Sequence, residues 1–475
     1  MLKLFPSVPK QPAVATQDRA TDAMTAAEKR VAFSLAAIFA LRMLGLFMIL
    51  PVLSLYAEHY QGYTPTLAGL AIGIYGLTQA IFQIPFGILS DRVGRKPIII
   101  GGLLLFAVGS VIAAFADSML GLIIGRGLQG MGAIAAVVMA LAADLTREEQ
   151  RTKAMAIIGA SIGIAFTAAL ILGPVLTHWI GLSGVFALTA LLALGGILLL
   201  QHAVPKPVIQ RHHRDAETLP SQIRRVVRDR QLLRLDAGIL ILHGILTASF
   251  VVIPLLLRDY GQLEASQHWL VYLSVLLASV CLMTPFILIA DKYRLTKPIF
   301  AAAVLMLALA QLGLLTFHTT LWQIALLLVV FFTGFNILEA NLPSLISRLA
   351  PPEAKGTALG IYSTSQFLGA FIGGLGGGWL YAHYGAVAVF EACAALALIW
   401  FALALTMKNP QALSSHLVRL MPISENEAPG VAAKLLAIPG VAEAVVIAEE
   451  RVAYLKVDRK RLDRQALQAI SAVEA

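Results

Sequence analysis

Residues 85–98 read PFGILSDRVGRKPI and connect two apolar segments, at about 66–89 and 97–116. The connection carries one carboxylate, Asp91, among three cations, whereas the two segments hold no charged side chain. Each segment has the ~20 mostly apolar residues that an α-helix needs to cross a bilayer. The stretch therefore predicts two transmembrane helices joined by a short, strongly charged loop.

The composition of the whole chain is typical of a membrane protein. Of 475 residues, 58% are apolar and only 13% are charged, and the mean hydropathy is +0.80, whereas a soluble domain has about 25% charged residues. These values exclude a soluble enzyme and a disordered chain. Cys281 and Cys393 lie in apolar runs, which excludes a disulfide framework and a cysteine metal site, so we expect no metal.

Apolar segments recur along the chain in two groups. The first group lies at about 33–56, 66–89, 97–116, 119–143, 153–177 and 183–203, and the second at about 235–257, 268–290, 298–317, 321–346, 356–381 and 385–406. Each segment must be helical, because lipid offers no hydrogen-bond partner to an open backbone. We predict an all-α polytopic membrane protein with 12 transmembrane helices in two six-helix pseudo-repeats, followed by a small α+β domain.

The polar stretches between these groups set the predicted domain order. The order is a cytoplasmic N-terminal tail (1–30), a six-helix bundle (31–203), a central loop (204–234), a second six-helix bundle (235–408) and a soluble domain (411–475).

Lysine and arginine predict which side of the membrane each loop faces. Nineteen of them lie in the loops after even-numbered helices, the central loop included, against one, Arg258, after odd-numbered helices. Because cytoplasmic loops carry the excess of positive charge, both termini and the central loop are expected in the cytoplasm. The same distribution accounts for the formal charge of +9 without a nucleic-acid partner.

The two groups are related in sequence. Pro85 and Asp91, at the end of the second predicted helix, recur 200 positions later as Pro285 and Asp291 at the end of the eighth. Further matches keep offsets of 200 to 204. Transporters built from such parallel repeats bind substrate near the middle of the membrane, between the halves. A central site between the bundles is therefore expected.

The loop quoted above resembles the signature loop of the major facilitator superfamily. From Gly87 onward the loop follows the pattern G-x-L-x-D-R-x-G-R-K that marks the signature loop. A plain positively charged cytoplasmic loop would explain the cations but neither the carboxylate nor the glycines. The resemblance implies a secondary transporter of that fold, working by alternating access, and not an enzyme.

The resemblance also implies a gate at the cytoplasmic end. In this family the loop carboxylate and the second arginine form a charge cluster with an acidic residue that ends the fourth helix and with the start of the eleventh helix, here near Gly356. Such a cluster locks the inner gate while the cavity faces outward. The predicted gating charge cluster consists of Gly87, Asp91, Arg92, Gly94, Arg95 and Asp144.

Two further stretches narrow the resemblance. RGLQGMGA at 126–133 resembles a motif of proton-coupled members, and Gly173-Pro174 resembles the core of the antiporter motif, although Ala169 stands where that motif has glycine. Together with the C-terminal extension, these stretches resemble the drug:proton antiporter branch and its YajR-like members with a C-terminal ferredoxin-like domain. This likeness implies the inner (plasma) membrane of a bacterium.

Few ionisable side chains lie within the predicted helices, where a charge costs about 2.5–3.5 kcal/mol on insertion scales. Glu339 is a candidate proton or cation site, or a hydrogen-bonding group between helices, and Asn336 lies one turn before it on the same face. Arg42 is a candidate to bind an anionic substrate or to pair with Glu339. Arg126 is a candidate for proton coupling or packing, and His243 for titration or simple hydrogen bonding.

Small residues indicate close contacts between helices. Gly173 and Pro174 in the fifth predicted helix, and Gly373 and Gly377 in the glycine-rich eleventh, are expected to permit close backbone approach. The approach serves either a helix that slides or bends during transport or tight static packing.

The C-terminal extension has the composition of a soluble domain. We predict the order βαββα, as in a ferredoxin-like fold without its last strand, with elements at 416–421, 428–437, 441–447, 452–457 and 462–470. The chain has no Cys-x-x-Cys pair here, which argues against metal carriage. The domain either docks on the transporter or dimerises, in a regulatory role, or it only stabilises the protein.

Together these features predict a secondary transporter driven by a proton gradient. The chain has no Walker A pattern and no hydrolase or metalloprotease motif, so we expect neither ATP hydrolysis nor a cofactor. The leading hypothesis is efflux of drug-like amphipathic molecules in exchange for protons. Uptake of a small metabolite by symport is the alternative, and a membrane-anchored sensor is a third. Arg42 and Arg126 favour an anionic substrate if both face the cavity unpaired, whereas Glu339 favours a cation.

Overall fold

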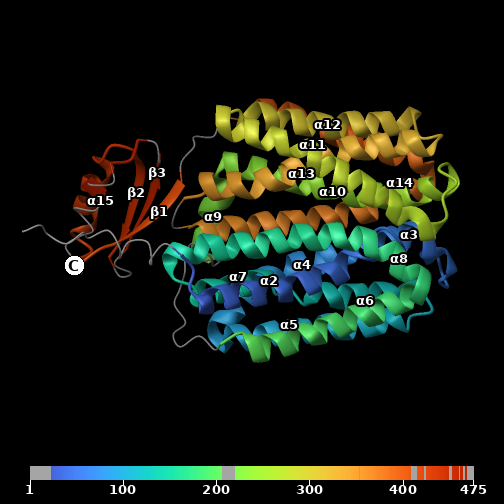
Figure 1. Ribbon diagram of the computed structural model, residues 1–475, viewed down its shortest axis with the longest axis horizontal. Helices are drawn as coiled ribbons and strands as arrows, with labels where there is room; N and C mark the ends of the chain where they lie inside the picture. Colours follow the sequence, from blue (N-terminus) through green and yellow to red (C-terminus); the bar gives the residue numbers. More distant parts are fainter. Residues whose placement is uncertain are drawn as a thin grey trace, which may run out of the picture.

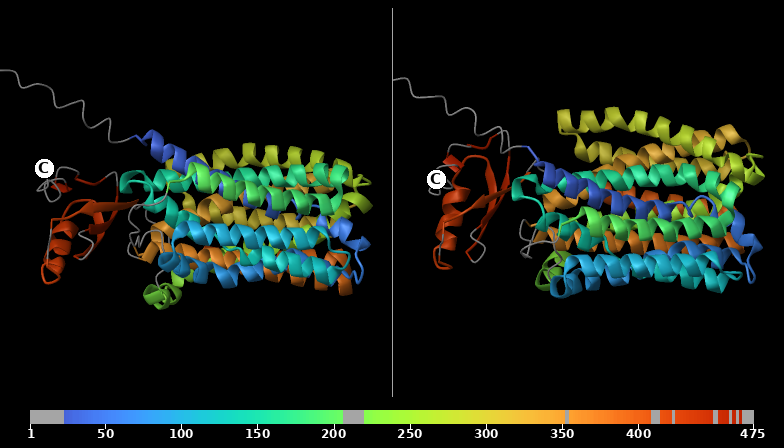
Figure 2. Two further views of the ribbon diagram at one scale, coloured as in Figure 1. Left: turned by 90° about the horizontal axis from the view of Figure 1, so that it is seen from below. Right: turned by 60° about the horizontal axis from the view of Figure 1, so that its bottom comes forward.

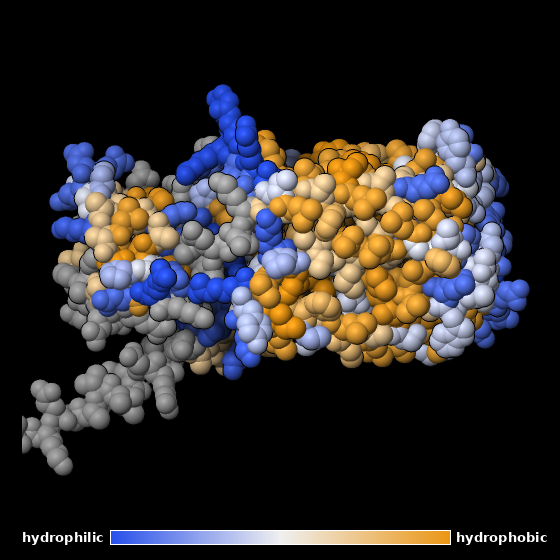
Figure 3. Space-filling model, turned by 90° about the horizontal axis from the view of Figure 1, so that it is seen from above, coloured by the Kyte–Doolittle hydropathy of each residue, from blue (hydrophilic) through white to orange (hydrophobic). Residues whose placement is uncertain are grey.

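The computed structural model describes residues 23–205, 220–351, 354–407, 414–421, 424–448, 452–458, 461–463 and 466–467. Long helices run roughly side by side along an elongated bundle, and a small sheet domain lies beyond one end of it (Figures 1 and 2). We call this the domain end and the other the far end. Apolar side chains cover the length of the bundle, with hydrophilic ones gathered at both ends (Figure 3).

The bundle contains two sets of helices. The first set is α2 (Ala26–Phe47), α3 (Leu53–Tyr56), the short η1 (Ala57–His59), α4 (Pro65–Val93), α5 (Arg95–Ala114), α6 (Met119–Met131), α7 (Ala135–Asp144) and α8 (Glu148–Ala203). The second set is α9 (Pro220–Arg228), α10 (Arg230–Asp259), the short η2 (Ala265–Gln267), α11 (His268–Tyr293), α12 (Thr296–Thr316), α13 (Leu321–Leu349) and α14 (Lys355–Leu405).

Two of these helices are long enough for two membrane crossings, and each is interrupted by a glycine with positive φ. In α8 the break is at Gly181, with φ 69°. Before the break Phe166 packs on Phe47, and after it Gly196 lies beside Ile38. Thirty residues of straight helix would extend about 45 Å, whereas the two partners lie nine positions apart in α2. The chain of α8 therefore reverses direction at its glycine.

The same reversal occurs in the second set. In α14 the break is at Gly385, with φ 82°. Gly377, before it, packs on Ala248, and Trp400, after it, packs on Gly238 of the same neighbouring helix. Ten helices in the described residues are long and apolar enough to span a membrane. Counting both arms of α8 and α14 gives twelve segments, and their crossing of a bilayer remains a prediction.

Several helices begin earlier than hydropathy predicts, because polar caps extend them. Thr25 and Glu28 form a reciprocal capping box that starts α2 at Ala26. Asp229 accepts hydrogen bonds from two backbone N–H groups of the first turn of α10, which starts at Arg230 inside the predicted central loop. Helix α9 also lies inside the predicted central loop. Residues 206–219 of that loop and most of the predicted tail, 1–22, lie outside the described residues.

The two halves meet most closely between α4 and α14. A Cβ atom added at Gly69 would lie 2.2 Å from the carbonyl oxygen of Gly374, and one at Gly76 would lie 2.4 Å from that of Phe367. At Gly87, nearer the domain end, an added Cβ would meet one side chain, Ala136 of the same half, at 3.8 Å. The close contact between the halves thus belongs to the far-end part of these helices.

The C-terminal domain has the predicted order of elements. Its described elements are β1 (Ser414–Arg419), α15 (Ala428–Leu436), β2 (Val441–Ile447) and β3 (Val452–Val457). The antiparallel sheet has the strand order β1-β3-β2, so β3 is central, as in a ferredoxin-like fold. Val418, Leu435 and Leu455 form part of its core. Most of the predicted helix at 462–470 lies outside the described residues.

Two polar contacts join this domain to the end of the bundle. The Lys456 ammonium donates a hydrogen bond to the Leu349 carbonyl at the end of α13, with an N–O distance of 3.2 Å. The Arg294 guanidinium, which follows α11, lies 3.8 Å from the Asp458 carboxylate. Both bundle residues belong to the second half.

Candidate functional site

The predicted gating charge cluster is assembled at the domain end. Gly94 has φ 108°, a conformation that glycine adopts readily, and it turns the chain sharply from α4 into α5. The turn brings the buried Arg95 guanidinium back onto the end of α4, where it pairs with the Asp91 carboxylate and donates to Ser90 Oγ at 2.7 Å. Its Nε also donates to Asp144 Oδ2 at 3.2 Å. One arginine thus joins the ends of α4 and α7.

Other members of the predicted cluster have lesser roles. Arg92 is exposed, and none of the hydrogen bonds or ion pairs given for the described residues involves it. Gly87 lies one helical turn before Asp91 and faces Ala136 of α7. Gly356, where the contact with α14 was predicted, is buried, and its contact with the cluster remains a prediction.

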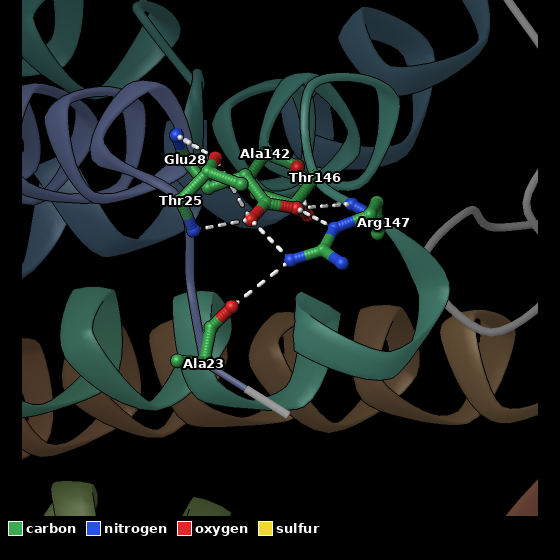
Figure 4. Close-up of polar contacts among 6 residues, drawn as sticks. All are labelled: Ala23, Thr25, Glu28, Ala142, Thr146 and Arg147. Carbon is green, nitrogen blue, oxygen red and sulfur yellow. Dashed lines mark hydrogen bonds and ion pairs between the residues drawn. The ribbon is translucent and has the colours of Figure 1, made fainter. Parts of the chain in front are cut away.

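A second polar cluster holds the adjacent α7–α8 loop (Figure 4). The hydropathy pattern did not predict this cluster. Glu28 Oε1 accepts hydrogen bonds from the backbone N–H of Arg147 at 3.0 Å and from its Nε at 2.9 Å. Arg147 Nη2 donates to Glu28 Oε2 and to the Ala23 carbonyl, both at 3.0 Å. The start of α2 is therefore tied to the loop that follows Asp144. The pattern Thr-x-x-Glu at residues 25–28, which predicts a capping box, was the signal in the sequence that could have pointed to Glu28.

We expect Asp91→Asn to reduce transport at least about tenfold while leaving membrane insertion intact. The change removes one carboxylate from the buried Arg95, and breaking a buried pair typically costs about 3–5 kcal/mol. Solute flux in proteoliposomes and the elution volume of the purified protein measure the two effects. Arg92→Gln, at the next residue of the same loop but exposed, is the matched control and should transport normally. Normal transport by Asp91→Asn would remove the gate from the account.

Three polar side chains from three helices of the second half meet in the interior of the bundle. Glu339 of α13 accepts a hydrogen bond from Gln366 Nε2 of α14 at 3.4 Å. The same amide nitrogen lies 2.9 Å from His243 Nε2 of α10, and this nitrogen lies 4.0 Å from Glu339 Oε2. The Glu339 side chain is 36% exposed and that of His243 9%. Although part of the Glu339 side chain is exposed, its Oε2 atom is buried and has no hydrogen-bond partner among the described residues.

Asn336 does not join this group. Its Nδ2 donates to Ser279 Oγ of α11 at 3.0 Å, whereas Glu339 contacts α10 and α14. The two side chains thus contact different neighbours, and a role of Asn336 in coupling or substrate binding stays a prediction.

The two predicted arginines lie in the first half. Arg42 is fully buried, and its Nη2 donates to Gln79 Oε1 of α4 at 2.5 Å. Tyr75 OH donates to the same oxygen at 3.2 Å, and Gln79 Nε2 donates to Gln83 Oε1 at 2.8 Å. The predicted ion pair between Arg42 and Glu339 is wrong, because the partner of Arg42 is a neutral amide of its own half.

Arg126 also uses neutral acceptors. Its Nε donates to the Ala71 carbonyl at 3.2 Å and its Nη1 to Gln129 Oε1 at 2.8 Å. Gln129 in turn donates to Ser110 Oγ at 2.7 Å. The guanidinium carbons of Arg42 and Arg126 lie 5.7 and 5.3 Å from the centre of the Tyr75 ring. The two cations thus share one aromatic side chain.

Comparison with known proteins agrees with this arrangement. Residues 35–261 and 236–437 match the Major Facilitator Superfamily, and residues 421–471 match the YajR YAM domain. The chain belongs to the major facilitator superfamily. It is 47% identical over 442 residues to the "Inner membrane transport protein YajR" of Escherichia coli (strain K12), covering 93% of this chain and 97% of that protein.

More distant relatives of this superfamily member agree in fold. It is 29% identical over 348 residues to the "Multidrug resistance protein MdtH" of Aeromonas salmonicida (strain A449), covering 71% of this chain and 84% of that one. The solved structure of a D-xylose–proton symporter matches with a TM-score of 0.63 at 17% identity, covering 80% of this chain and 98% of the other. The human organic anion transporter MFSD10 gives 0.59 at 19% identity, covering 79% and 99%. The predicted fold class, and a transporter rather than an enzyme, are confirmed.

The predicted small residues lie at close helix contacts in this transporter. A Cβ added at Gly173 would lie 2.4 Å from the Met48 carbonyl oxygen, and one at Gly373 would lie 2.1 Å from that of Gly244. One at Gly377 would lie 2.8 Å from Ala248 Cα. Pro174 lies within α8. The close approach is as predicted, and the choice between a sliding helix and static packing stays open.

An ion pair joins the two halves at the far end, where the sequence predicted no site. Arg258 Nη1, at the end of α10, lies 3.2 Å from Glu58 Oε2 in η1 of the first half. Arg258 Nε also pairs with Asp259 at 2.7 Å. Nearby, Ser54 Oγ donates to the Phe250 carbonyl at 3.4 Å. With the α4–α14 contact, these bonds close the far end. Glu58 and Arg258 lie 200 positions apart, which is the offset of the sequence repeat. This relation was the signal in the sequence that could have pointed to the pair.

Proposed function

We propose that this superfamily member exports drug-like amphipathic molecules across a bacterial inner membrane in exchange for protons. Glu339 is the observation that carries the proposal, because a carboxylate in mid-helix, beside an amide and an imidazole and with one buried oxygen that has no partner among the described residues, is suited to bind and release a proton. Intramembrane carboxylates of this kind are costly and serve proton or ion pathways. The direction of export rests on the likeness to a multidrug resistance protein.

Rocking of the two halves relative to each other gives the alternating access. With the domain end in the cytoplasm, as its lysines and arginines favour, the conformer described here is closed outside by the α4–α14 contact and the Arg258–Glu58 pair. A proton that reaches Glu339 from outside neutralises the carboxylate. Glu339 releases this proton to the cytoplasm when the domain end is open. The Asp91–Arg95–Asp144 cluster is already formed within the first half here, and in the opposite conformer it would contact the start of α14 near Gly356 and so hold the cytoplasmic end closed.

Flux through proteoliposomes tests this function. Purified protein is reconstituted with ethidium as the probe, and a pH gradient of either sign is imposed. Export in exchange for protons predicts that ethidium moves up its gradient against the proton flow, and collapse of the pH gradient with an ionophore should stop it. Ethidium movement in the same direction as protons would indicate symport instead. No movement of ethidium or protons would support the sensor hypothesis.

We also propose that the C-terminal domain docks on the second half and moves with it. Lys456 and Asp458 contact Leu349 and Arg294, which both belong to that half. A domain held by one half does not restrict rocking, so a chain ending at residue 407 should transport within about twofold of the full-length rate. The contacts it loses are one hydrogen bond, worth about 0.5–1.5 kcal/mol, and one partly exposed ion pair, worth about 0–1 kcal/mol. Loss of transport on truncation would instead indicate a domain that regulates the bundle.

A further inference from the structure

The buried arginines of the first half lack negative partners. Arg42 and Arg126 are 0% and 3% exposed. None of the ion pairs given for the described residues includes either of them, and their hydrogen bonds go to Gln79, Gln129 and a backbone carbonyl. Arginine keeps its charge in proteins. Two full positive charges therefore lie in the interior of one half with only neutral acceptors around them.

The hydrogen-bond donors of Arg42 are also incompletely used. Its Nε and Nη1 atoms are buried without an acceptor among the described residues. Buried charges in proteins are ordinarily paired, and a buried donor without an acceptor is costly. The rings of Tyr75 and Phe106 lie 5.7 and 5.6 Å from the Arg42 guanidinium carbon, and they offer no lone pair to these N–H groups. What Arg42 lacks is an anion.

The position of the pair places it beside the interface between the halves. The Tyr75 ring, which both cations contact, lies 6.3 Å from the Phe367 ring of α14. Phe367 follows Gln366, which contacts Glu339 and His243. The arginines thus lie just behind a contact that must change when α4 and α14 separate, across from the acidic group of the second half.

We propose that Arg42 and Arg126 form a binding site for a small monovalent anion, either a free ion or the carboxylate group of a transported solute. The planar guanidinium suits a carboxylate or a comparable oxoanion, to which it can donate two hydrogen bonds. Since Arg42 is fully enclosed in this conformer, the site takes a small ion here, and a larger molecule enters when the Tyr75–Phe367 contact opens. The solute part of the proposal rests on the proposed transport function, and the binding of a free ion does not.

Thermal unfolding of the purified full-length protein tests the site. Bromide replaces the bulky sulfonate anion of Hepes at constant ionic strength, because this anion carries no carboxylate and is too large for the enclosed site. The melting temperature of the wild type should rise with bromide and saturate, and Arg42→Gln should weaken the apparent affinity at least tenfold. Arg234→Gln, which removes one positive charge from the exposed surface, is the matched control and should respond as the wild type does.

Several results would overturn the site. The absence of a saturable rise in the wild type would do so, as would an unchanged response of Arg42→Gln. Should Arg42→Gln not fold, the anomalous signal of bromide in wild-type crystals decides, with a peak expected beside the Arg42 guanidinium and a peak elsewhere, or none, contradicting the site.

A series of carboxylates separates the two sources of the anion. Formate, acetate and benzoate are titrated in the same Hepes buffer. A response to formate that is lost by benzoate assigns the site to a free ion, and a response to benzoate that Arg42→Gln removes assigns it to a solute carboxylate. Glu339→Gln should keep the bromide response, so failure of proton coupling and failure of the anion site can be told apart.

Discussion

Glu339→Gln is expected to abolish proton-driven transport and to leave the protein folded and able to bind its solute. Glutamine has nearly the same shape and keeps an oxygen that accepts the hydrogen bond of Gln366, but it cannot take up or release a proton. With a pH gradient, ethidium flux should fall to the level of empty liposomes, because intramembrane carboxylates mark the pathways of transported protons. Exchange of labelled for unlabelled ethidium without a gradient should persist.

The control for this change is a second intramembrane glutamate. Glu391 lies in the second arm of α14 and is exposed, so Glu391→Gln should transport at the wild-type rate. A Glu339→Gln variant whose flux still follows the pH gradient would show that another group carries the proton. Loss of both gradient-driven flux and exchange would place Glu339 in solute binding instead.

Gly374→Val should prevent closure of the far end. A Cβ added at Gly374 would lie 2.7 Å from the Gly69 carbonyl oxygen and 2.9 Å from Gly73 Cα, and these backbone atoms cannot yield as a flexible side chain would. Overpacking of this kind costs about 1–3 kcal/mol, and each 1.4 kcal/mol is a tenfold change in equilibrium. The closed conformer should therefore lose about ten- to a hundredfold in population, with a comparable fall in flux.

The same helix offers the matched control. An added Cβ at Gly376, two positions on, meets nothing within 4 Å, so Gly376→Val makes the same change of helix propensity without the collision. It should transport within about twofold of the wild type, since valine costs at most about 0.7 kcal/mol in a helix and glycine about 1 kcal/mol, both relative to alanine. Equal flux in the two variants would show that the α4–α14 contact is not needed for transport.

Much of this architecture follows from patterns that physics ties closely to structure. A helix of ~20 apolar residues is the solution that lipid permits, so the positions of the helices could be read from hydropathy. The cluster of Asp91, Arg95 and Asp144 was implied by the resemblance of the loop at 85–98 to the signature loop of the superfamily, and the structure brings these residues together.

Partners across the bundle were less predictable, because sequence patterns within a helix do not tell which neighbour a side chain faces. Glu339 was identified as a candidate, but its partners His243 and Gln366 come from two other helices. Arg42 was paired with it by charge alone, and the structure places Arg42 against Gln79 in the other half. The starts of α2 and α10 were missed because side-chain caps, rather than hydropathy, fix them.

The central claim is that the two halves rock, so that one end opens as the other closes. Distances between spin labels, measured by pulsed electron paramagnetic resonance, test it directly in the reconstituted protein. One pair replaces Val93 and Tyr293 at the domain end, and the other replaces Phe115 and Phe317 at the far end, all four of which are exposed. The account predicts that a change of pH or the addition of ethidium shifts the two distances in opposite directions. Distances that stay fixed, or that lengthen together, would contradict it.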